Sequence, residues 1–158
     1  MNHHQDTKDS KEAPRASGAA ESCIQVGMDP RKDLSVREEW LASQIVDSAI
    51  HVHSALGPGL LESVYESCLE WELRSRGIGV QRQVAFPVRY GGVELTAGLR
   101  VDCVVDDLVI LELKAVEAIQ PLHEAQLLTY LRLSGRRLGF ILNFNVPRMK
   151  DGIRRKVM

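Results

Sequence analysis

Two charged residues, Glu112 and Lys114, interrupt the apolar run of residues 108–116, and an aspartate, Asp102, precedes them. Because alternate side chains of a strand project from opposite faces, Glu112 and Lys114 are expected to share one face. Burying ions on an apolar strand is costly unless they are paired or coordinate a metal. Two carboxylates that bind Mg²⁺ beside a lysine are suited to the hydrolysis of phosphodiesters, since the ion stabilises phosphoryl charge and acidifies water. The alternative is a structural Glu-Lys pair on a half-exposed strand.

Asp102 can act with Glu112 only if both side chains project from the same face of the sheet. In a regular hairpin, residues of the two strands share a face only when the numbers of paired residues sum to an even value. If Asp102 is paired with Glu112, the same register places Val105 opposite Val109. The turn then has three residues, 106–108. A two-residue turn at 106–107 would point Asp102 away from Glu112, so the sequence predicts the three-residue turn or a bulge.

Two helices are predicted before the strands. Apolar residues recur at helical spacing from Ser35 to about Leu56, and Ser35 with Glu38 forms a capping box. The Gly-Pro-Gly sequence at 57–59 ends this helix. A second helix follows as far as Arg76, and its expected apolar side consists of Leu61, Val64, Cys68 and Trp71.

After the second helix, the spacing of apolar residues changes from that of a helix to that of strands. Residues 80–90, 93–97 and 99–105 are rich in β-branched and aromatic side chains, which predicts an antiparallel meander with a hairpin turn at Gly91 and Gly92. Pro87 indicates an edge strand or a bulge. After the Glu112 strand, residues 122–133 form a helix and 138–144 a last, buried strand. The predicted fold is α/β, a mixed sheet flanked by helices in the order α-α-β-β-β-α-β.

Length and composition indicate one domain. The chain has 158 residues, 44% of them hydrophobic and 26% charged, which suits a single globular domain over residues 34–158. Residues 1–33 are polar and lack periodicity, so they are expected to be a disordered tail. The apolar stretches are too short for a membrane helix and the N-terminus lacks a signal-peptide core, so a cytoplasmic protein without membrane contact is expected.

The charges are divided along the chain. After residue 131, eight basic residues face one acidic residue and give that end a net charge of +7, whereas residues 35–131 carry −7. The basic end could contact phosphates, and the acidic part could gather carboxylates around a cation. The alternative for each is a solvated surface of mixed sign.

Two helical pairs could border the Glu112 site. Gln126 and Tyr130 are spaced i, i+4 on the helix that follows, and Glu62 and Tyr65 are i, i+3 neighbours on the second helix. An ordinary amphipathic surface with a half-buried tyrosine explains each pair equally well.

Several motifs in sequence order resemble one known family. The segment Gly59-Leu-Leu-Glu62-Ser-Val-Tyr65 resembles the signature of the GxxExxY proteins, a branch of the PD-(D/E)xK nuclease superfamily. The resemblance extends from about Val46 to Val157. Its further motifs are Val52-His53, Leu56-Gly-Pro-Gly59, Arg100-Val-Asp102, Val109-Ile-Leu-Glu-Leu-Lys-Ala115, Ala125-Gln-Leu-Leu-Thr-Tyr-Leu131, Gly139-Phe-Ile-Leu-Asn-Phe144 and Gly152-Ile-Arg-Arg155.

The resemblance implies a restriction-endonuclease-like core and a metal site. Mg²⁺ or Mn²⁺ would be held at the positions of Asp102 and Glu112, and Lys114 would take the place of the catalytic lysine. Gln126 and Tyr130 resemble residues that shape the site in exonuclease-like branches. Glu62 resembles an acid of the first core helix that can join the metal network.

We therefore expect a metal-dependent nuclease acting on DNA or RNA. The auxiliary phosphate contacts expected at the basic end are Arg136, Arg137, Arg154 and Arg155. A homodimer is compatible with so small a chain. The alternative is a catalytically idle module of the same fold that binds nucleic acid or a protein partner.

Overall fold

The structure is a computed structural model that describes residues 33–158, except for the side chains of Thr96 and Ala97. Apart from Asp33, the predicted tail of residues 1–33 lies outside the described residues. The elements in chain order are α1 (Val36–Leu56), α2 (Glu62–Ser75), β1 (Val80–Tyr90), β2 (Val93–Val105), β3 (Val109–Lys114), α3 (Pro121–Ser134), β4 (Leu138–Asn143), the 3₁₀ helix η1 (Met149–Gly152) and β5 (Ile153–Val157). No helix in this part of the chain is long and apolar enough to cross a bilayer.

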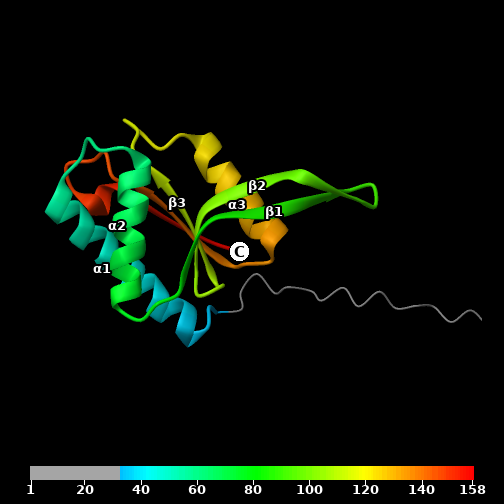
Figure 1. Ribbon diagram of the computed structural model, residues 1–158, viewed down its shortest axis with the longest axis horizontal. Coiled ribbons are helices and arrows are strands. Elements are labelled where there is room, and N and C mark those ends of the chain that lie inside the picture. The colour runs from blue at the N-terminus through cyan, green and yellow to red at the C-terminus, as the bar shows by residue number, and fades with distance from the viewer. Residues whose placement is uncertain (1–32) are drawn as a thin grey trace, which may run out of the picture.

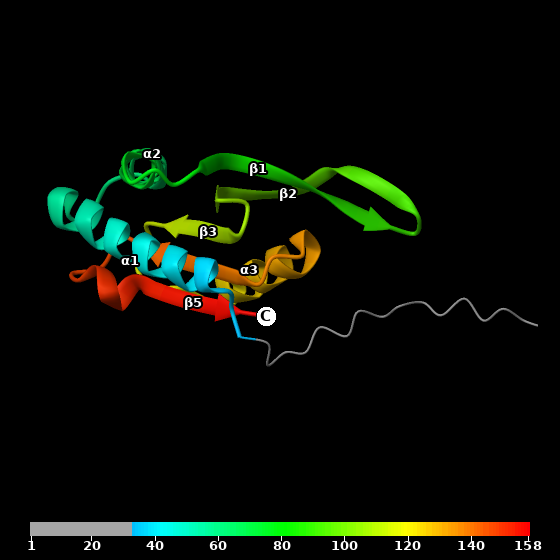
Figure 2. The same ribbon diagram turned by 90° about the horizontal axis from the view of Figure 1, so that it is seen from below.

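One five-stranded sheet lies between two helical layers (Figures 1 and 2). The strands are arranged in sequence order, and every neighbouring pair is antiparallel except β3 and β4, which are parallel and joined through α3. Helices α1 and α2 pack on one face around a large apolar cluster, and α3 packs on the other face around a smaller one. The predicted α/β fold with a mixed sheet is confirmed, and the predicted order of elements is matched as far as β4.

Strand β5 was not predicted. It follows η1 and pairs with β4 through Leu138 opposite Val157 and Leu142 opposite Ile153, so that it forms the second edge of the sheet. Its sequence, Ile-Arg-Arg-Lys-Val, carries three consecutive basic residues and lacks the alternation that identifies a half-buried strand. At an edge, however, charged side chains are well tolerated because they reach solvent.

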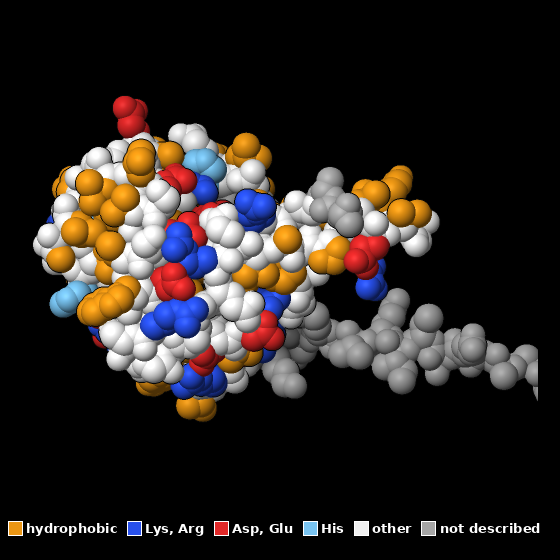
Figure 3. All heavy atoms as spheres, viewed as in Figure 1, with side chains coloured by type: hydrophobic (Ala, Val, Ile, Leu, Met, Phe, Trp, Pro, Cys, Tyr) orange, Lys and Arg blue, Asp and Glu red, His pale blue; other side chains and the backbone are white. Residues whose placement is uncertain are grey.

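The packing face of α2 differs from the prediction. Leu61 and Trp71, placed on the apolar side by the sequence, are 75% and 70% exposed, whereas Tyr65, Leu69 and Leu73 are fully buried. Helix α2 therefore has two apolar stripes, and the sheet covers the one that contains the tyrosine. Figure 3 shows hydrophobic side chains gathered on the outer surface of the helical layer as a result.

Tyr65 fixes the loop between α1 and α2. Its ring stacks on Phe144 with centroids 4.3 Å apart, its hydroxyl donates to the carbonyl of Gly57 at 2.6 Å, and it accepts from the amide of Leu60 at 3.1 Å. The fully buried side chain thus satisfies two backbone groups of a loop that has no ladder partners of its own. The loop leads directly into Glu62, the first residue of α2. By holding the loop, Tyr65 therefore also fixes the position of the Glu62 side chain.

Tyr65→Phe is expected to lower the free energy of unfolding by about 1–3 kcal/mol, because it leaves a backbone carbonyl and an amide without their buried partner. Urea unfolding measures the change. Tyr90→Phe is the matched control, since Tyr90 lies at the tip of the β1–β2 hairpin and is 80% exposed. Equal stability of the two variants would contradict an anchoring role for the Tyr65 hydroxyl.

Strands β1 and β2 form a long hairpin that projects from the body of the molecule (Figure 2). Its two-residue turn consists of Gly91 and Gly92, both with positive φ, as a type I′ turn requires. Strand β1 is an edge strand, and its register shifts between Phe86 and Val88, on either side of Pro87. The hairpin prediction is confirmed, and Pro87 marks both an edge and a bulge.

Candidate active site

The register of β2 and β3 brings Asp102 and Glu112 to the same place. Val105 pairs with Val109 and Cys103 with Leu111, which confirms the predicted three-residue turn. The same register puts Asp102 opposite Glu112. Both side chains therefore project from the face that α3 covers, like Val104 and Ile110 of the same strands.

The two carboxylates lie where β2 and β3 leave their ladder. The last paired residues are Cys103 and Leu111. Beyond them the Asp102 Oδ2 accepts from the amide of Leu113 at 2.8 Å, and the charge of Asp102 acts on the Glu112 carboxylate. Asp102 thus takes over a backbone donor of β3, and this bond holds its carboxylate at the opening of the sheet, opposite Glu112.

Glu112 is buried with an unsatisfied oxygen. The residue is 6% exposed, its Oε1 has no hydrogen-bond partner, and its Oε2 lies 3.4 Å from the Lys114 Nζ. Burial and the neighbouring Asp102 carboxylate raise the pKa of Glu112 from its ordinary 4.5 to about 7, because Lys114 only partly offsets them. Burial also raises the pKa of Asp102, and this effect outweighs the hydrogen bond from the Leu113 amide, which lowers that pKa. A buried and a half-buried acid with raised pKa values are what a bound cation would relieve.

Lys114 is the positive group of the site. Its Nζ also donates to the carbonyl of Leu113 at 3.2 Å. Burial disfavours the charged amine, but Glu112, Asp102 and Glu62 outweigh burial and raise its pKa. Lys114 is therefore held as a cation beside Glu112 and within electrostatic range of Asp102.

Glu62 borders the site from α2. Its Oε1 accepts from the amide of Ala115 at 3.0 Å, directly after the Lys114 strand, and its charge acts on both Asp102 and Lys114. One turn further along α2, Glu66 also raises the pKa of Asp102. The sequence did not identify Glu66, although its i, i+4 spacing from Glu62 was a usable signal.

Tyr130 and Gln126 differ in how closely the structure connects them with the acids. Burial raises the pKa of Tyr130, and Glu112 adds to this effect, so the phenol lies within electrostatic range of the pair. Gln126 is exposed one turn earlier on the same side of α3 and makes no side-chain hydrogen bond within the described residues. On the same helix, His123 accepts from the amide of Gln120 and caps the N-terminus of α3.

Asn143 is a further residue that the sequence did not single out. It pairs with Lys114 across the parallel strands and is 1% exposed. Its amide nitrogen donates to the carbonyl of Val116 at 2.8 Å, and its Oδ1 accepts from the amide of Val116 at 3.1 Å. Asn143 thereby fixes the chain just after Lys114. Only the pairing of β3 with β4 reveals this role.

The four predicted phosphate-binding arginines are dispersed. The guanidinium of Arg136 pairs with Asp107, stacks over Phe86 at 4.9 Å and has a side chain only 14% exposed. Arg137 donates to the carbonyls of Met158 and Asp33. Both arginines therefore lie near the β2–β3 turn, at the opposite end of β3 from Lys114.

The other two arginines lie on β5. Arg155 pairs with Glu39 on the α1 side. Arg154 is opposite Ile141, which in turn is opposite Glu112. Arg154 therefore lies in the same cross-sheet row as Glu112, two strands away, and is the one of the four arginines that the register places in that row.

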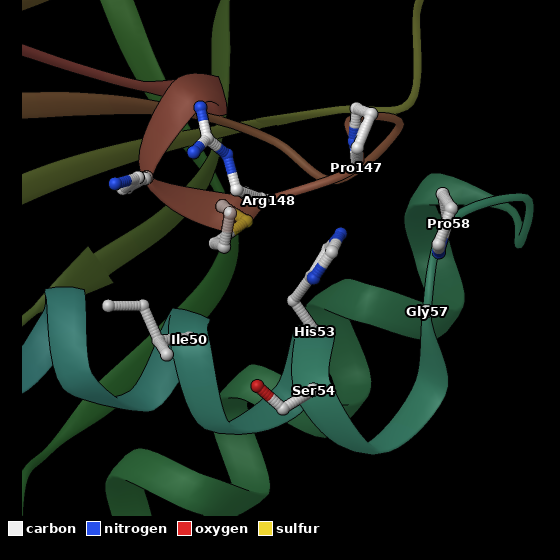
Figure 4. Close-up of a pocket in the computed structure, with 9 residues that line it drawn as sticks. Ile50, His53, Ser54, Gly57, Pro58, Pro147 and Arg148 are labelled. Carbon is white, nitrogen blue, oxygen red and sulfur yellow. The ribbon is translucent and has the colours of Figure 1, made fainter.

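A cavity of about 590 Å³ lies between the end of α1 and the connection from β4 to η1 (Figure 4). Its walls come from the end of α1 and from residues 147–150, and the described lining contains two basic residues and no acid. His53 extends from α1 toward Arg148 and Pro147 in Figure 4, where its Nε2 bonds to the carbonyl of Val146 at 2.8 Å. The cavity lacks carboxylates, so the candidate active site is the acid pair and not this cavity.

The donor set fits a hard divalent cation. Within residues 33–158, no group of three or more His, Cys, Asp or Glu side chains is arranged to hold an ion, and Glu62 binds Ala115 instead. Mg²⁺ commonly takes one or two protein carboxylates and keeps several waters. Asp102 and Glu112, with the unpartnered Oε1 of Glu112, provide such a pair. A third ligand from Glu62 remains a prediction.

Comparison with known proteins agrees with this geometry. A solved structure, described as the crystal structure of SSO0001, matches 77% of this chain and 60% of its own at 19% identity, with a TM-score of 0.47. The chain thus spans about 60% of that protein's length, and so distant a likeness supports no functional argument. No curated protein matches the chain. A family model described as the PD-(D/E)XK nuclease superfamily matches residues 39–156, which include every residue of the site. With acids on β2 and β3 and a lysine two residues after the second acid, the chain belongs to the PD-(D/E)XK nuclease superfamily.

Proposed function

We propose that this protein is a metal-dependent nuclease that hydrolyses phosphodiester bonds of DNA or RNA, with Asp102 and Glu112 as the ligands of Mg²⁺ or Mn²⁺. The observation that carries the proposal is the buried, unpartnered Oε1 of Glu112 between Asp102 and Lys114. A carboxylate in that state destabilises the fold unless a cation completes it. Membership of the GxxExxY branch, a homodimer and a cytoplasmic location remain predictions.

The chain's own residues divide the remaining tasks. When bound, the ion supplies charge stabilisation at the phosphoryl oxygens and a more acidic water. Lys114 Nζ, fixed by Glu112 and the Leu113 carbonyl, is placed to stabilise negative charge that develops on the phosphate. Tyr130, which lies within electrostatic range of Glu112, and Gln126, one turn earlier on α3, would orient the substrate.

Phosphate recognition away from the scissile bond is assigned chiefly to Arg154. It is exposed, and its Nη1 bonds only to the carbonyls of Asp151 and Ile153 among the described residues, so it keeps donors for a phosphate. Arg136, by contrast, is occupied by Asp107 and Phe86. Charge reversal at Arg154 is thus expected to weaken binding of nucleic acid more than charge reversal at Arg155, which a salt bridge to Glu39 holds on the α1 side.

Mn²⁺ is expected to stabilise the protein against unfolding, and more at pH 8 than at pH 5.5. The pKa of Glu112 is raised to about 7, so at pH 5.5 the ion must displace a proton before that carboxylate can bind it. At a tenfold excess over the dissociation constant the stabilisation at pH 8 amounts to roughly 1.4 kcal/mol. Thermal unfolding with and without Mn²⁺ measures it.

Asp102→Ala provides the decisive comparison. It is expected to lose the Mn²⁺ effect at both pH values and to lose cleavage of single- and double-stranded DNA and RNA. If Mn²⁺ stabilises wild type and Asp102→Ala equally, the metal site is wrong. If wild type binds Mn²⁺ but cuts none of the four substrates, the idle module is the better description.

A further inference from the structure

Gln83 has an unusual backbone for a strand residue. It lies within β1 but has φ +52°, in the left-handed region that residues other than glycine rarely adopt. On either side of it the ladder is regular, since Arg82 pairs with Cys103 and Val84 with Val101. The register therefore puts Gln83 directly opposite Asp102, and the left-handed residue interrupts β1 at the first acid of the site.

The interruption turns the strand. Residues of equal parity lie on one face of a regular strand. Val80 belongs to the apolar cluster beneath α1 and α2, and the Arg82 guanidinium reaches Glu66 of α2. Beyond Gln83, Val84 and Phe86 pack instead against the cluster beneath α3. Gln83 is the point at which β1 changes the helical layer that it faces.

The side chain of Gln83 ties this turn to α2. Its Nε2 donates to both carboxylate oxygens of Glu66, at 3.1 and 3.0 Å. Glu66 is 5% exposed, and its Oε1 also accepts from the Arg82 Nε at 2.7 Å. Figure 3 shows acidic and basic side chains alternating in a band between α2 and the hairpin. The amide of Gln83, an exposed residue, thus contributes to a charged cluster in which Glu66 is the buried member.

We propose that Gln83 is a positioning residue for Asp102, an inference that rests on the proposed function. The left-handed turn and the amide contact with Glu66 hold β1 away from a regular ladder at Asp102. That segment of β2 is then free to leave β3, so that the Asp102 carboxylate meets the Leu113 amide and faces Glu112. Gln83 acts through the orientation of Asp102 and does not itself bind the ion.

The test compares two glutamines of the same edge strand. Gln81 is exposed, opposite Val104, and its side chain makes no hydrogen bond within the described residues, so Gln81→Ala is the control for Gln83→Ala. Gln83→Gly is the second variant, because glycine adopts a positive φ without strain and keeps the turn while it loses the amide. Binding of Mn²⁺ is followed by electron paramagnetic resonance, and urea unfolding reports whether each variant is folded.

Both Gln83 variants are expected to raise the Mn²⁺ dissociation constant by about tenfold or more, as loss of residues that orient metal ligands typically does. They should also lower kcat without changing KM for the nucleic acid, whereas Gln81→Ala should match wild type. Should alanine destabilise the fold too far, the glycine variant decides the question. Mn²⁺ binding at wild-type strength in Gln83→Gly would overturn the inference.

Asp102→Ala, measured beside them, distinguishes the two levels of the proposal. Weak Mn²⁺ binding in Asp102→Ala with normal binding in both Gln83 variants removes the role of Gln83 and leaves the proposed function standing. Normal binding in Asp102→Ala removes the metal site itself, and the positioning role with it.

Discussion

Lys114→Ala is expected to lower the rate of phosphodiester cleavage by about 10²–10³-fold, the usual cost of removing one group that stabilises developing negative charge. The variant should not weaken Mn²⁺ binding. Removing the Nζ that lies 3.4 Å from the Glu112 Oε2 takes a competing cation away from the carboxylate. Lys114→Ala would thus separate the two roles of the site, because it retains the ion and loses the chemistry.

The measurement is a single-turnover cleavage rate combined with a Mn²⁺ titration. Lys150→Ala serves as the control, since Lys150 is an exposed lysine on the wall of the separate cavity in Figure 4. Cleavage by Lys114→Ala at the wild-type rate would contradict the assignment of the lysine. Loss of Mn²⁺ binding by the same variant would show that Lys114 maintains the acids instead.

Glu112→Gln is expected to abolish cleavage and, in metal-free buffer at pH 8, to raise the free energy of unfolding by up to about 3 kcal/mol. The pKa of this carboxyl is about 7 in the folded protein and 4.5 ordinarily. Between those values the unfolded chain has released the proton while the folded chain still holds it. Wild-type stability therefore falls as the pH rises from about 4.5 to about 7 and changes no further above that range.

Glutamine removes this proton linkage and keeps the shape of the side chain. Its advantage over wild type should consequently vanish near pH 4, where the carboxyl is protonated in both states. Urea unfolding across the pH range measures the difference. Glu117→Gln is the control, because Glu117 is an exposed glutamate without a side-chain partner among the described residues. A wild-type protein whose metal-free stability rises between pH 5 and pH 7 relative to Glu112→Gln would contradict the burial argument.

Local rules predicted the centre of the site. Given that Asp102 and Glu112 act together, the parity argument predicted Val105 opposite Val109 or else a bulge, and the register confirms the first, because a one-residue slip would have reversed every side chain of β3. Capping chemistry placed the start of α1, where the Ser35 hydroxyl accepts from the amide of Glu38. These features depend on neighbours within a few residues, which a single sequence displays.

Features that depend on distant partners could not be predicted in the same way. Helix α2 has two apolar stripes, and the buried one is decided by the hydrogen bonds of Tyr65 to the 57–60 loop. Asn143 gains its role from pairing with Lys114, and Gln83 from facing Asp102 and reaching Glu66. Two of the four arginines, Arg136 and Arg137, lie at the end of β3 that is far from Lys114. The sequence shows that these residues are basic, but it does not show near which end of the sheet they lie.

The irregularity of β1 has a consequence for the behaviour of the protein in concentrated solution. An edge strand offers a row of free backbone donors and acceptors onto which a strand of another molecule can add. In β1, Pro87 lacks a donor, the register shifts beside it, and the backbone of Gln83 is left-handed. No long regular stretch remains as a template for such addition. The same kinks that shape the hairpin therefore protect its outer edge from edge-to-edge aggregation.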